Sequence, residues 1–431
     1  MIDGLDEDVV PSGWESLALG EVCLAVSKID PLELGRDEFK YIDIGSIDSS
    51  TNSVGSPQLL KVEDAPGRAR QHVRTGDSVF STVRPYLRNI AYVDEALDGE
   101  IASTGFCVLR PNLLMVLPRF IRFFAISDNL LGQVLPLQRG VSYPAVRDKE
   151  VMQTRILVPP LEEQERIVEI LDEQLSRLDS ALASVRAVRQ KSARFRRSLL
   201  HAAFTGALTG HDTSKKNFPA TWAVGQIRDV AEFVRGVTYQ KSEARNQLED
   251  GYIPLLRATN IGNESITYDE FVYVPRNVVK SEQLIQVNDM VVAASSGSIS
   301  IVGKSAPVLK EFEATFGAFC AVLRPKEGVL PGFLRLYVQS PSVRETWSNL
   351  ARGTNINNLK REQVLSTNMP IAPFPEQEKI VEILDEQLSR LDDALVLADV
   401  IEKKASAMRR SLLHAAFSGN LTKEWREGAH V

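Results

Sequence analysis

The string IVEILDEQLSRLD decides the fold of this chain, because it occurs twice, at residues 167–179 and 380–392. The identity extends beyond the string: residues 163–182 and 376–395 agree at 18 of 20 positions. Both matched pairs are separated by 213 residues, about half of the 431-residue chain. A period this long is not that of a solenoid, so it indicates that a whole domain and its following helix have been duplicated.

Each copy of the string predicts a long amphipathic helix. Apolar residues recur at alternating steps of four and three, the spacing of a coiled-coil seam. Prolines precede both helices and a glycine follows each, at Gly206 and Gly419, as is typical of helix boundaries. A helix from 163 to 204 would be roughly 63 Å long and could not be stable on one unpaired apolar stripe. We therefore expect the two helices to pair through Ile167, Leu171, Leu175, Leu178 and Leu182 of the first and Ile380, Leu384, Leu388, Leu391 and Leu395 of the second.

The segments that precede the helices predict two related modules of mixed secondary structure. Strand-like stretches such as YIDIGSI and GFCVLRP have counterparts in YIPLLRATNI and FCAVLRP. The expected fold class is α+β, with two mixed α/β domains in a pseudo-two-fold arrangement, separated by two long antiparallel coiled-coil helices. The heptad pattern alone leaves the helix orientation open. The expected divisions are a tail at 1–10, a first domain at 11–158, a first helix region at 159–210, a second domain at 211–371, a second helix region at 372–424 and a tail at 425–431.

Composition narrows the class of protein. With 44% apolar and 25% charged residues the chain is of ordinary globular type, and no apolar run reaches the roughly 20 residues that a membrane span needs. The three scattered cysteines show no metal-ligand spacing, which favours reduced thiols in a cytoplasmic protein. A net charge of −6 argues against non-specific coating of nucleic acid, but not against a sequence reader with local basic loops.

No stretch of the sequence assembles a catalytic or metal site. The segment GSISIVGKS at 297–305 resembles a phosphate-binding loop, but it has five residues rather than four between its glycine and the Gly-Lys pair. The five histidines do not cluster, and His201 and His414 are equivalent positions in the two helices. We therefore expect no catalytic residue, no metal and no cofactor in this chain, which would bind rather than catalyse.

The order of these parts resembles that of a known family. A variable module, a proline, then EQE(R/K)IVEIL and RRSLLHAAF(T/S)GxLT, all present twice, is similar to the specificity subunit (HsdS) of type I restriction–modification systems. The stretches GWESLALGEV, FSTVRPYLRNIAYV and STGFCVLRP resemble the first target-recognition domain of that family. The stretches GVTYQKSEA, SSGSISIVGKS and GTNINNLK resemble the second.

This resemblance implies a set of partners. Each target-recognition domain would read one half of a split sequence in double-stranded DNA, and the antiparallel helices would set the length of the spacer between the halves. Two methyltransferase subunits would dock on the chain and methylate adenine with S-adenosylmethionine. Restriction subunits, which use ATP and Mg²⁺, would join them to translocate and cut DNA. No membrane would be involved, and the complex would be cytoplasmic.

Polar and basic loops supply the candidate DNA contacts. Arg, Lys, Asn, Ser and Tyr side chains are the types that reach phosphates and base edges, although surface loops are rich in them anyway. The candidates in the first domain are Arg84, Tyr86, Arg88, Arg139, Ser142 and Tyr143. Those in the second are Arg235, Tyr239, Lys241, Arg257, Asn260, Ser296, Ser298, Lys304, Asn355 and Asn357.

Two other readings remain open on the sequence. The chain could be a non-catalytic adaptor, with two sugar- or peptide-binding modules on a coiled-coil spacer, or an enzyme whose site has no recognisable motif. Co-purification separates these readings, because a specificity subunit should bind two copies of a methyltransferase whereas an adaptor should be indifferent to DNA.

Overall fold

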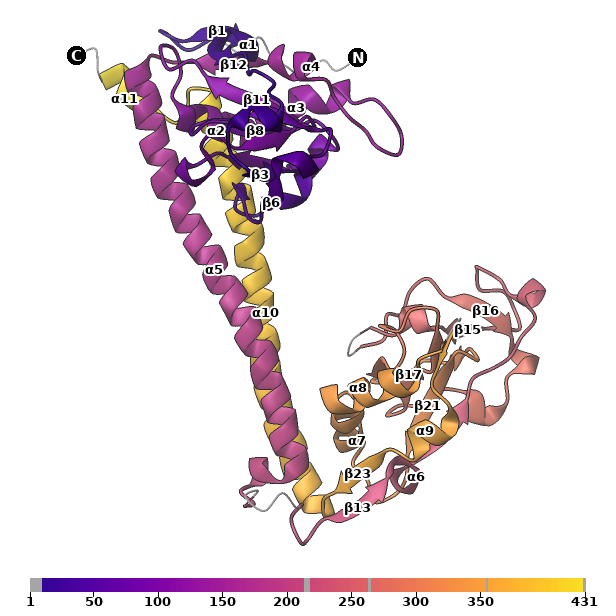
Figure 1. Ribbon diagram of the computed structural model, residues 1–431. Helices are drawn as coiled ribbons and strands as arrows, with labels where there is room; N and C mark the ends of the chain where they lie inside the picture. The colour runs from indigo at the N-terminus through magenta and orange to yellow at the C-terminus, as the bar shows by residue number, and fades with distance from the viewer. Residues whose placement is uncertain (1–9, 213–217, 263–264, 354–355, 429–431) are drawn as a thin grey trace. The chain divides into compact units, whose positions relative to one another are not determined.

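The computed structural model describes residues 10–212, 218–262, 265–353 and 356–428 (Figure 1). The chain divides into two compact units, one formed by residues 1–185 with 399–431 and the other by residues 186–398. Each unit therefore contains one mixed α/β domain together with half of each long helix. The prediction of two mixed domains on long antiparallel helices is confirmed.

Unit 1 is built on a six-stranded and a four-stranded sheet. In the larger sheet the strand order is β2-β11-β8-β9-β5-β4, and in the smaller one it is β6-β3-β10-β7, with β3 and β10 parallel. A separate pair, β1 with β12, joins the start of the domain to its end. The strands are β1 Glu15–Ala18, β2 Cys23–Leu24, β3 Glu38–Ile42, β4 Ile47–Asp48, β5 Ser53–Val54, β6 Gln58–Lys61, β7 Ala69–His72, β8 Ser78–Ser81, β9 Ile90–Tyr92, β10 Ile101–Ser103, β11 Phe106–Pro111 and β12 Arg155–Val158. The short helices are α1 Leu19–Val22, α2 Pro118–Ile126, α3 Asp128–Val134 and α4 Asp148–Met152.

Unit 2 has the same arrangement of two sheets, each with fewer strands. Its strands are ordered β14-β21-β17-β19 and β16-β15-β20, with β13–β23 and β18–β22 as separate pairs. The parallel pair β15–β20 is the counterpart of β3–β10. The strands are β13 Ala223–Gln226, β14 Ala231–Arg235, β15 Tyr252–Leu256, β16 Val272–Pro275, β17 Met290–Ala293, β18 Ser295–Ser296, β19 Ser305–Pro307, β20 Thr315–Phe316, β21 Cys320–Pro325, β22 Asn357–Asn358 and β23 Asn368–Ile371. The short helices are α6 Ile227–Val230, α7 Pro331–Val338, α8 Pro341–Leu350 and α9 Arg361–Leu365.

The two long helices are α5, Leu161–Thr205, and α10, Phe374–Phe417. In unit 1 Arg409 of α10 pairs with Asp179 of α5, and Phe417 at the end of α10 packs in the same core as Ile167 near the start of α5. Later residues of α10 therefore lie beside earlier residues of α5. In unit 2 the equivalent Arg196 pairs with Asp392 at 3.3 Å. The helices are therefore antiparallel in both units.

The apolar residues of the repeated strings pack differently from the expected string-to-string contact. In unit 1 Ile167, Leu171 and Leu175 are buried with Leu413, Ala416 and Phe417 from the end of α10, and Leu178 packs against the same core. In unit 2 Ile380, Leu384 and Leu388 are buried with Leu200, Ala203 and Phe204, and Leu391 packs against them. Leu182 and Leu395 are half-buried. Each string therefore packs against the other helix's RRSLLHAAF segment, because antiparallel pairing brings the start of one repeat to the end of the other.

The helix ends belong to the domain cores rather than to a separate spacer. The Phe417 ring lies 5.1 Å from that of Phe120 and 5.2 Å from that of Phe124, both in α2. In unit 2 the Phe204 ring lies 5.3 Å from that of Phe333 in α7. Aromatic contacts of this kind add to the burial of apolar area.

Residues 425–428 of the predicted C-terminal tail belong to a further helix, α11, Lys423–Gly428. Arg426 of this helix donates to Glu163 at 2.9 Å and to the carbonyl of Gly419 at 2.7 Å. These bonds attach the C-terminal segment to the start of α5.

Cys23, Cys107 and Cys320 are free and buried, and burial raises the pKa of Cys320 to about 12. Among the residues that the structure describes, none of the helices combines the length and apolar character that crossing a bilayer would require.

Candidate nucleic-acid interface

Two polar stretches that are far apart in the sequence meet in unit 1. We call residues 81–89 and 138–147 loop pair 1. A β-bridge joins Val83 to Ala145, and the amide of Arg84 donates to the carbonyl of Pro144 at 2.7 Å. The amide of Val146 also donates to the carbonyl of Thr82 at 2.9 Å. The backbone thus positions the second stretch on the end of strand β8.

Arg84 connects the two stretches through its side chain. Its guanidinium lies 4.6 Å from the centre of the Tyr143 ring and donates to the carbonyl of Ser142 at 3.1 Å. Arg84 and Arg88 adopt left-handed backbone conformations, with φ of 49° and 54°. Non-glycine residues in this region cost free energy, and such residues cluster at functional sites.

A tight hairpin presents the tip of the second stretch. Arg139 and Ala145 exchange two backbone hydrogen bonds of 2.9 Å, and Gly140 has φ of +96°. A Cβ at Gly140 would lie 3.1 Å from the carbonyl oxygen of Tyr143, so the turn requires glycine. In Figure 1 this loop projects beyond the body of the first domain, between α3 and α4.

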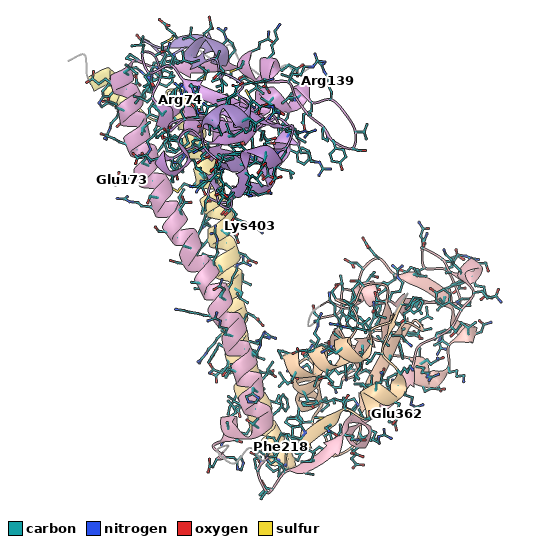
Figure 2. All side chains as sticks on the ribbon, in the orientation of Figure 1. Arg74, Arg139, Glu173, Phe218, Glu362 and Lys403 are labelled. Atoms are coloured by element: carbon teal, nitrogen blue, oxygen red, sulfur yellow. The ribbon has the colours of Figure 1, made fainter. Side chains whose placement is uncertain are left out.

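The exposed side chains of loop pair 1 are of the types that bind nucleic acid. Tyr86 and Tyr143 are 46% and 71% exposed, and Ser142 is exposed. Arg139 is exposed as well, at the edge of the domain in Figure 2, and is oriented by a 2.7 Å ion pair with Glu150. Arg88 differs, because its guanidinium pairs with Asp128 and so stabilises the loop.

The same construction occurs in unit 2. We call residues 295–304 and 351–361, apart from 354–355, loop pair 2. Strands β18 and β22 pair Ser295 with Asn358 and Ser296 with Asn357, at the positions that correspond to Val83 and Ala145. The side-chain amide of Asn357 donates to the carbonyl of Gly297 at 3.2 Å. Both domains thus present two chain segments joined by a short antiparallel pairing.

The candidates in loop pair 2 differ in availability. Ser298 is exposed and its hydroxyl lies 2.8 Å from that of Ser300. Ser296 and Lys304 are half-buried, and Asn357 both closes the loop and remains partly accessible. Asn355 lies outside the described residues. Loop pair 2 is therefore rich in hydroxyl and amide groups, whereas loop pair 1 is rich in arginine and tyrosine.

The remaining candidates of the second domain lie outside loop pair 2. Asn260 is 3% exposed, and its side-chain amide donates to the carbonyls of Thr267 and Asp269. Arg257 is half-buried and donates to the carbonyl of Glu270 at 3.1 Å. Tyr239 packs against an apolar cluster around Val237. The contacts of these three residues stabilise the second domain itself. In a sequence, a polar residue that bonds to backbone carbonyls looks the same as one that contacts a ligand.

The exposed Lys241 and Arg235 remain available for contact in this domain. Arg235 ends strand β14 and lines a groove along that strand. Backbone hydrogen bonds nevertheless link three of the candidate stretches to residues 316–319. The amides of Val237 and Ser295 donate to the carbonyls of Phe316 and Phe319, and the carbonyl of Leu256 accepts from the amide of Gly317.

Sequence reasoning missed the residues that attach each domain to its helix. Glu163 accepts hydrogen bonds from Trp14 at 2.9 Å, Thr422 at 2.6 Å and Arg426 at 2.9 Å. Its counterpart Glu376 accepts from Trp222 at 2.8 Å and Thr209 at 2.5 Å, and lies 2.7 Å from the His211 ring nitrogen. The signal was present, because the tryptophans, the EQE triplets and the threonines all recur in both copies.

The neighbouring glutamines serve the same junctions. The side chain of Gln164 accepts from the amide of Leu117 at 2.9 Å and donates to the carbonyl of Pro159 at 2.9 Å. Gln377 repeats this pattern with Leu330 and Ala372, each at 2.8 Å. The EQE triplet is therefore a structural anchor that fixes the domain at the start of the helix.

Within the described part of the chain, no group of three or more His, Cys, Asp or Glu side chains is arranged to hold a metal ion. The fold and the loop pairs define a two-domain protein with duplicated, loop-built surfaces on a shared pair of antiparallel helices.

A family model identifies the kind of protein that has this organisation. Residues 11–182 and 219–394 each match the type I restriction modification DNA specificity domain. The two matches cover well over half of the chain and correspond to the duplication. The chain therefore belongs to the family of type I restriction–modification specificity subunits.

Curated relatives agree with this assignment. The chain is 41% identical over 213 residues to the type I restriction enzyme EcoKI specificity subunit of Escherichia coli K12, covering 49% of this chain and 46% of that protein. It is 39% identical over 213 residues to the StySPI specificity subunit of Salmonella potsdam, again over 49% of this chain and 46% of that protein. The chain thus spans about half the length of these relatives. The EcoDI specificity subunit of Escherichia coli is 26% identical over 97% of this chain and 90% of its own length.

Solved structures extend the likeness to the whole fold. A chain from a structure described as the basis of complex assembly and conformational transition of the type I R-M system has a TM-score of 0.74. It is 28% identical and covers 96% of this chain and 99% of its own. The HsdS subunit from Thermoanaerobacter tengcongensis has a TM-score of 0.57 at 27% identity, covering 96% and 98%.

Proposed function

We propose that this chain is the DNA-recognition subunit of a type I restriction–modification complex and that each domain reads one half of a bipartite target in double-stranded DNA. The observation that carries the proposal is the duplicated loop pair. The same two chain segments meet through the same short pairing in both domains, yet their exposed side chains differ. A shared framework with different contact residues is what two unlike half-sites require.

Loop pair 1 has the chemistry for contact with a duplex. Arginine donates two parallel hydrogen bonds to guanine in the major groove, and tyrosine contributes a flat ring and a hydroxyl. Arg139, Ser142 and Tyr143 lie on one hairpin whose backbone is fixed by Gly140 and by Arg84. A rigid hairpin loses little conformational entropy when it enters a groove.

Loop pair 2 would read its half-site mainly through neutral groups. Ser296, Ser298 and Asn357 can donate and accept, and asparagine pairs well with the edge of adenine. Lys304 and Lys241 would supply contacts to phosphates, which position the domain without adding sequence information. This division predicts that the two half-sites differ in base composition.

The helix pair would set the spacer. At 1.5 Å per residue, the 45-residue α5 is roughly 68 Å long. Two modules that read the major groove from the same side need centres separated by about one helical turn, roughly 34–36 Å, or a multiple of it. Continuous helices of this length can hold two modules at such a separation.

Catalysis would be carried out by other subunits. Two adenine methyltransferase subunits with S-adenosylmethionine would dock on the chain, and restriction subunits with ATP and Mg²⁺ would join them. The names of the relatives support this assembly, because they are specificity subunits of restriction enzymes. The family assignment disfavours the alternative of an adaptor for sugars or peptides.

Methylome sequencing tests the proposal directly. A host without other adenine methylation, expressing this chain with its methyltransferase, should show one methylated motif made of two short specific halves and a spacer of fixed length. A host with the methyltransferase alone is the control and should show none. A continuous motif, or methylation that does not depend on this chain, would overturn the proposal.

A further inference from the structure

A groove of about 610 Å³ follows one edge of the four-stranded sheet in unit 2. Strand β14 forms its floor, since all five residues from Ala231 to Arg235 line it. Helices α6 and α9 and the turn at 280–283 contribute the walls. We call it the β14 edge groove. Among the strands that the structure describes, β14 pairs only with β21, and the groove lies along its residues.

The backbone at this edge has the pattern of a strand that can accept a neighbour. The amide of Lys326, just after β21, donates to the carbonyl of Val230, and in an antiparallel ladder alternate residues face the partner strand. Phe233 and Arg235 then direct their backbone groups toward the groove. The carbonyl of Arg235 indeed accepts from the side chain of Gln283 at 3.1 Å. An open edge of this kind can pair with an extended peptide.

The walls of the groove are mainly basic. Arg228, Arg235, Lys280, Lys326 and Arg361 line it, against only two acidic residues, Glu232 and Glu282. Some of these cations are already in use. Arg228 pairs with Glu362, and Lys326 donates to the carbonyl of Arg228 at 2.7 Å.

Three cations remain to attract a ligand. Arg361 lies over the Phe233 ring, 5.8 Å from its centre, and among the described residues neither Arg235 nor Lys280 has an ion pair. Arg235, Lys280 and Arg361 are all exposed. They line the same groove as Phe233, so the groove offers a strand edge and positive charge together.

The first domain lacks this chemistry. Strand pairing aligns Pro111 with Pro325, which places Ala25 where the second domain has Phe233. The equivalent of Arg361, at the first position of the short helix, is Asp148. The edge strand β2 is also only two residues long. Because the framework is duplicated and these residues are not, a role for the groove would be specific to the second domain.

We propose that the β14 edge groove binds an extended acidic segment of a partner protein, which adds to the sheet as a strand beside β14. Backbone hydrogen bonds to Phe233 and to the amide of Arg235, whose carbonyl already accepts from Gln283, would give affinity. The cations would select carboxylate side chains. This proposal does not rest on DNA reading by the loop pairs. Phosphates of a duplex are attracted by the same cations, but they need no open strand edge.

A labelled peptide of ten residues, alternating valine and glutamate, is the probe. Fluorescence anisotropy with the full-length chain at physiological salt should show saturable binding. The Lys280→Glu/Arg361→Glu double variant should bind it at least about tenfold more weakly, since two favourable charges are replaced by two repulsive ones. Lys149→Glu, an exposed residue in the short helix of the first domain, is the matched control and should leave the affinity unchanged.

Strand addition is tested separately by the backbone of the probe. The same peptide with N-methyl groups on alternate residues keeps its charge. It lacks the amide hydrogens along one edge, however, and cannot pair with β14 through that edge. It should bind the wild-type chain about tenfold more weakly, as one or two lost hydrogen bonds imply. This arm does not depend on the folding of any variant.

Three results would overturn the proposal. The first is no binding of the unmodified peptide to the wild-type chain. The second is that the peptides N-methylated at either set of alternate residues bind as tightly as the unmodified peptide, which would mean that only charge contributes to binding. The third is that the double variant weakens binding of a duplex lacking the target but not of the peptide, which would make the groove a phosphate track.

Discussion

The indole nitrogen of Trp14 donates to a carboxylate oxygen of Glu163 at 2.9 Å, across 149 residues of sequence. Trp222 and Glu376 repeat this bond at 2.8 Å in the second unit. Each bond joins the first strand region of a domain to the first turn of its long helix. The near-identity of the two helices thus reflects a common docking arrangement at each end, as well as helix pairing.

The Trp14 bond should contribute measurably to the stability of unit 1. Glu163 is 2% exposed, so a lost donor leaves a buried carboxylate oxygen without its partner. Trp14→Phe should lower the free energy of unfolding by about 1–3 kcal/mol in urea titrations. Trp425→Phe, at a half-buried tryptophan with no hydrogen bond from its indole among the described residues, is the control. Equal effects of the two substitutions would show that the hydrogen bond is not the cause.

Acid should weaken unit 2 through Glu376. Although burial acts to raise it, hydrogen bonds from Thr209, Trp222 and His211 hold the pKa of Glu376 below its ordinary value. A carboxyl with a depressed pKa stabilises the fold above its unfolded pKa and loses that contribution as the pH falls through its folded pKa. The free energy of unfolding should therefore fall as the pH drops below roughly 4.3.

A substitution assigns this dependence to Glu376. Glu376→Gln removes the titrating group, so unfolding of the variant should depend less on pH in this acidic range. Glu378→Gln, at an exposed position of the same helix, is the control. Its free energy of unfolding should change with pH as steeply as that of the wild type. If both variants keep that slope, another group is responsible.

In each domain an ion pair with a buried aspartate joins the ends of two neighbouring strands. Arg110 in β11 pairs with Asp77 at 2.6 Å, and Arg324 in β21 pairs with Asp289 at 2.8 Å. Arg110→Met leaves the carboxylate of Asp77, 2% exposed, without its countercharge and should cost about 3–5 kcal/mol. Arg177→Ala, which removes an exposed pair with Glu173, should cost no more than about 0.5 kcal/mol. If adding Asp77→Asn restores part of the lost free energy of unfolding, the unpaired charge of Asp77 is the cause. If it restores none, the loss comes from packing.

Helix length should determine the spacer of the DNA target. An insertion of four residues near Arg186–Lys191, matched at 399–404, would lengthen the helices by about 6 Å and rotate one domain against the other. Methylome sequencing should then show unchanged half-sites with a different spacer. An equal insertion at the exposed Leu113 and Leu114 should change neither. Altered half-sites with the old spacer would contradict the ruler role.

Much of the architecture could be predicted from the repeat. The strings at 167–179 and 380–392 predicted two long helices, and the duplicated FCVLRP and FCAVLRP stretches predicted paired domains. The heptad pattern could not predict which residues of one long helix contact which residues of the other. The packing of Ile167 against the end of α10 follows from antiparallel order, which apolar spacing does not encode.

The candidate site was less predictable, because loop composition does not separate a contact residue from a structural one. Arg84, Ser142 and Tyr143 come from separate stretches and do meet. Asn260 has the same polar character, but its side chain is buried and donates to a backbone carbonyl of its own domain. The anchoring roles of Glu163 and Gln164 depend on contacts more than 40 residues away, which only the folded chain displays.

The most direct test of the central claim is methylome sequencing of two variants in parallel, each expressed with the methyltransferase. Arg139→Ala/Tyr143→Ala alters loop pair 1, and Ser298→Ala/Asn357→Ala alters loop pair 2. Loss of a base reader costs about 1–3 kcal/mol, so each variant should relax positions in one half-site only, a different half for each, with the spacer unchanged. If either variant changes both halves, or both variants change the same half, the assignment of one half-site to each domain is wrong.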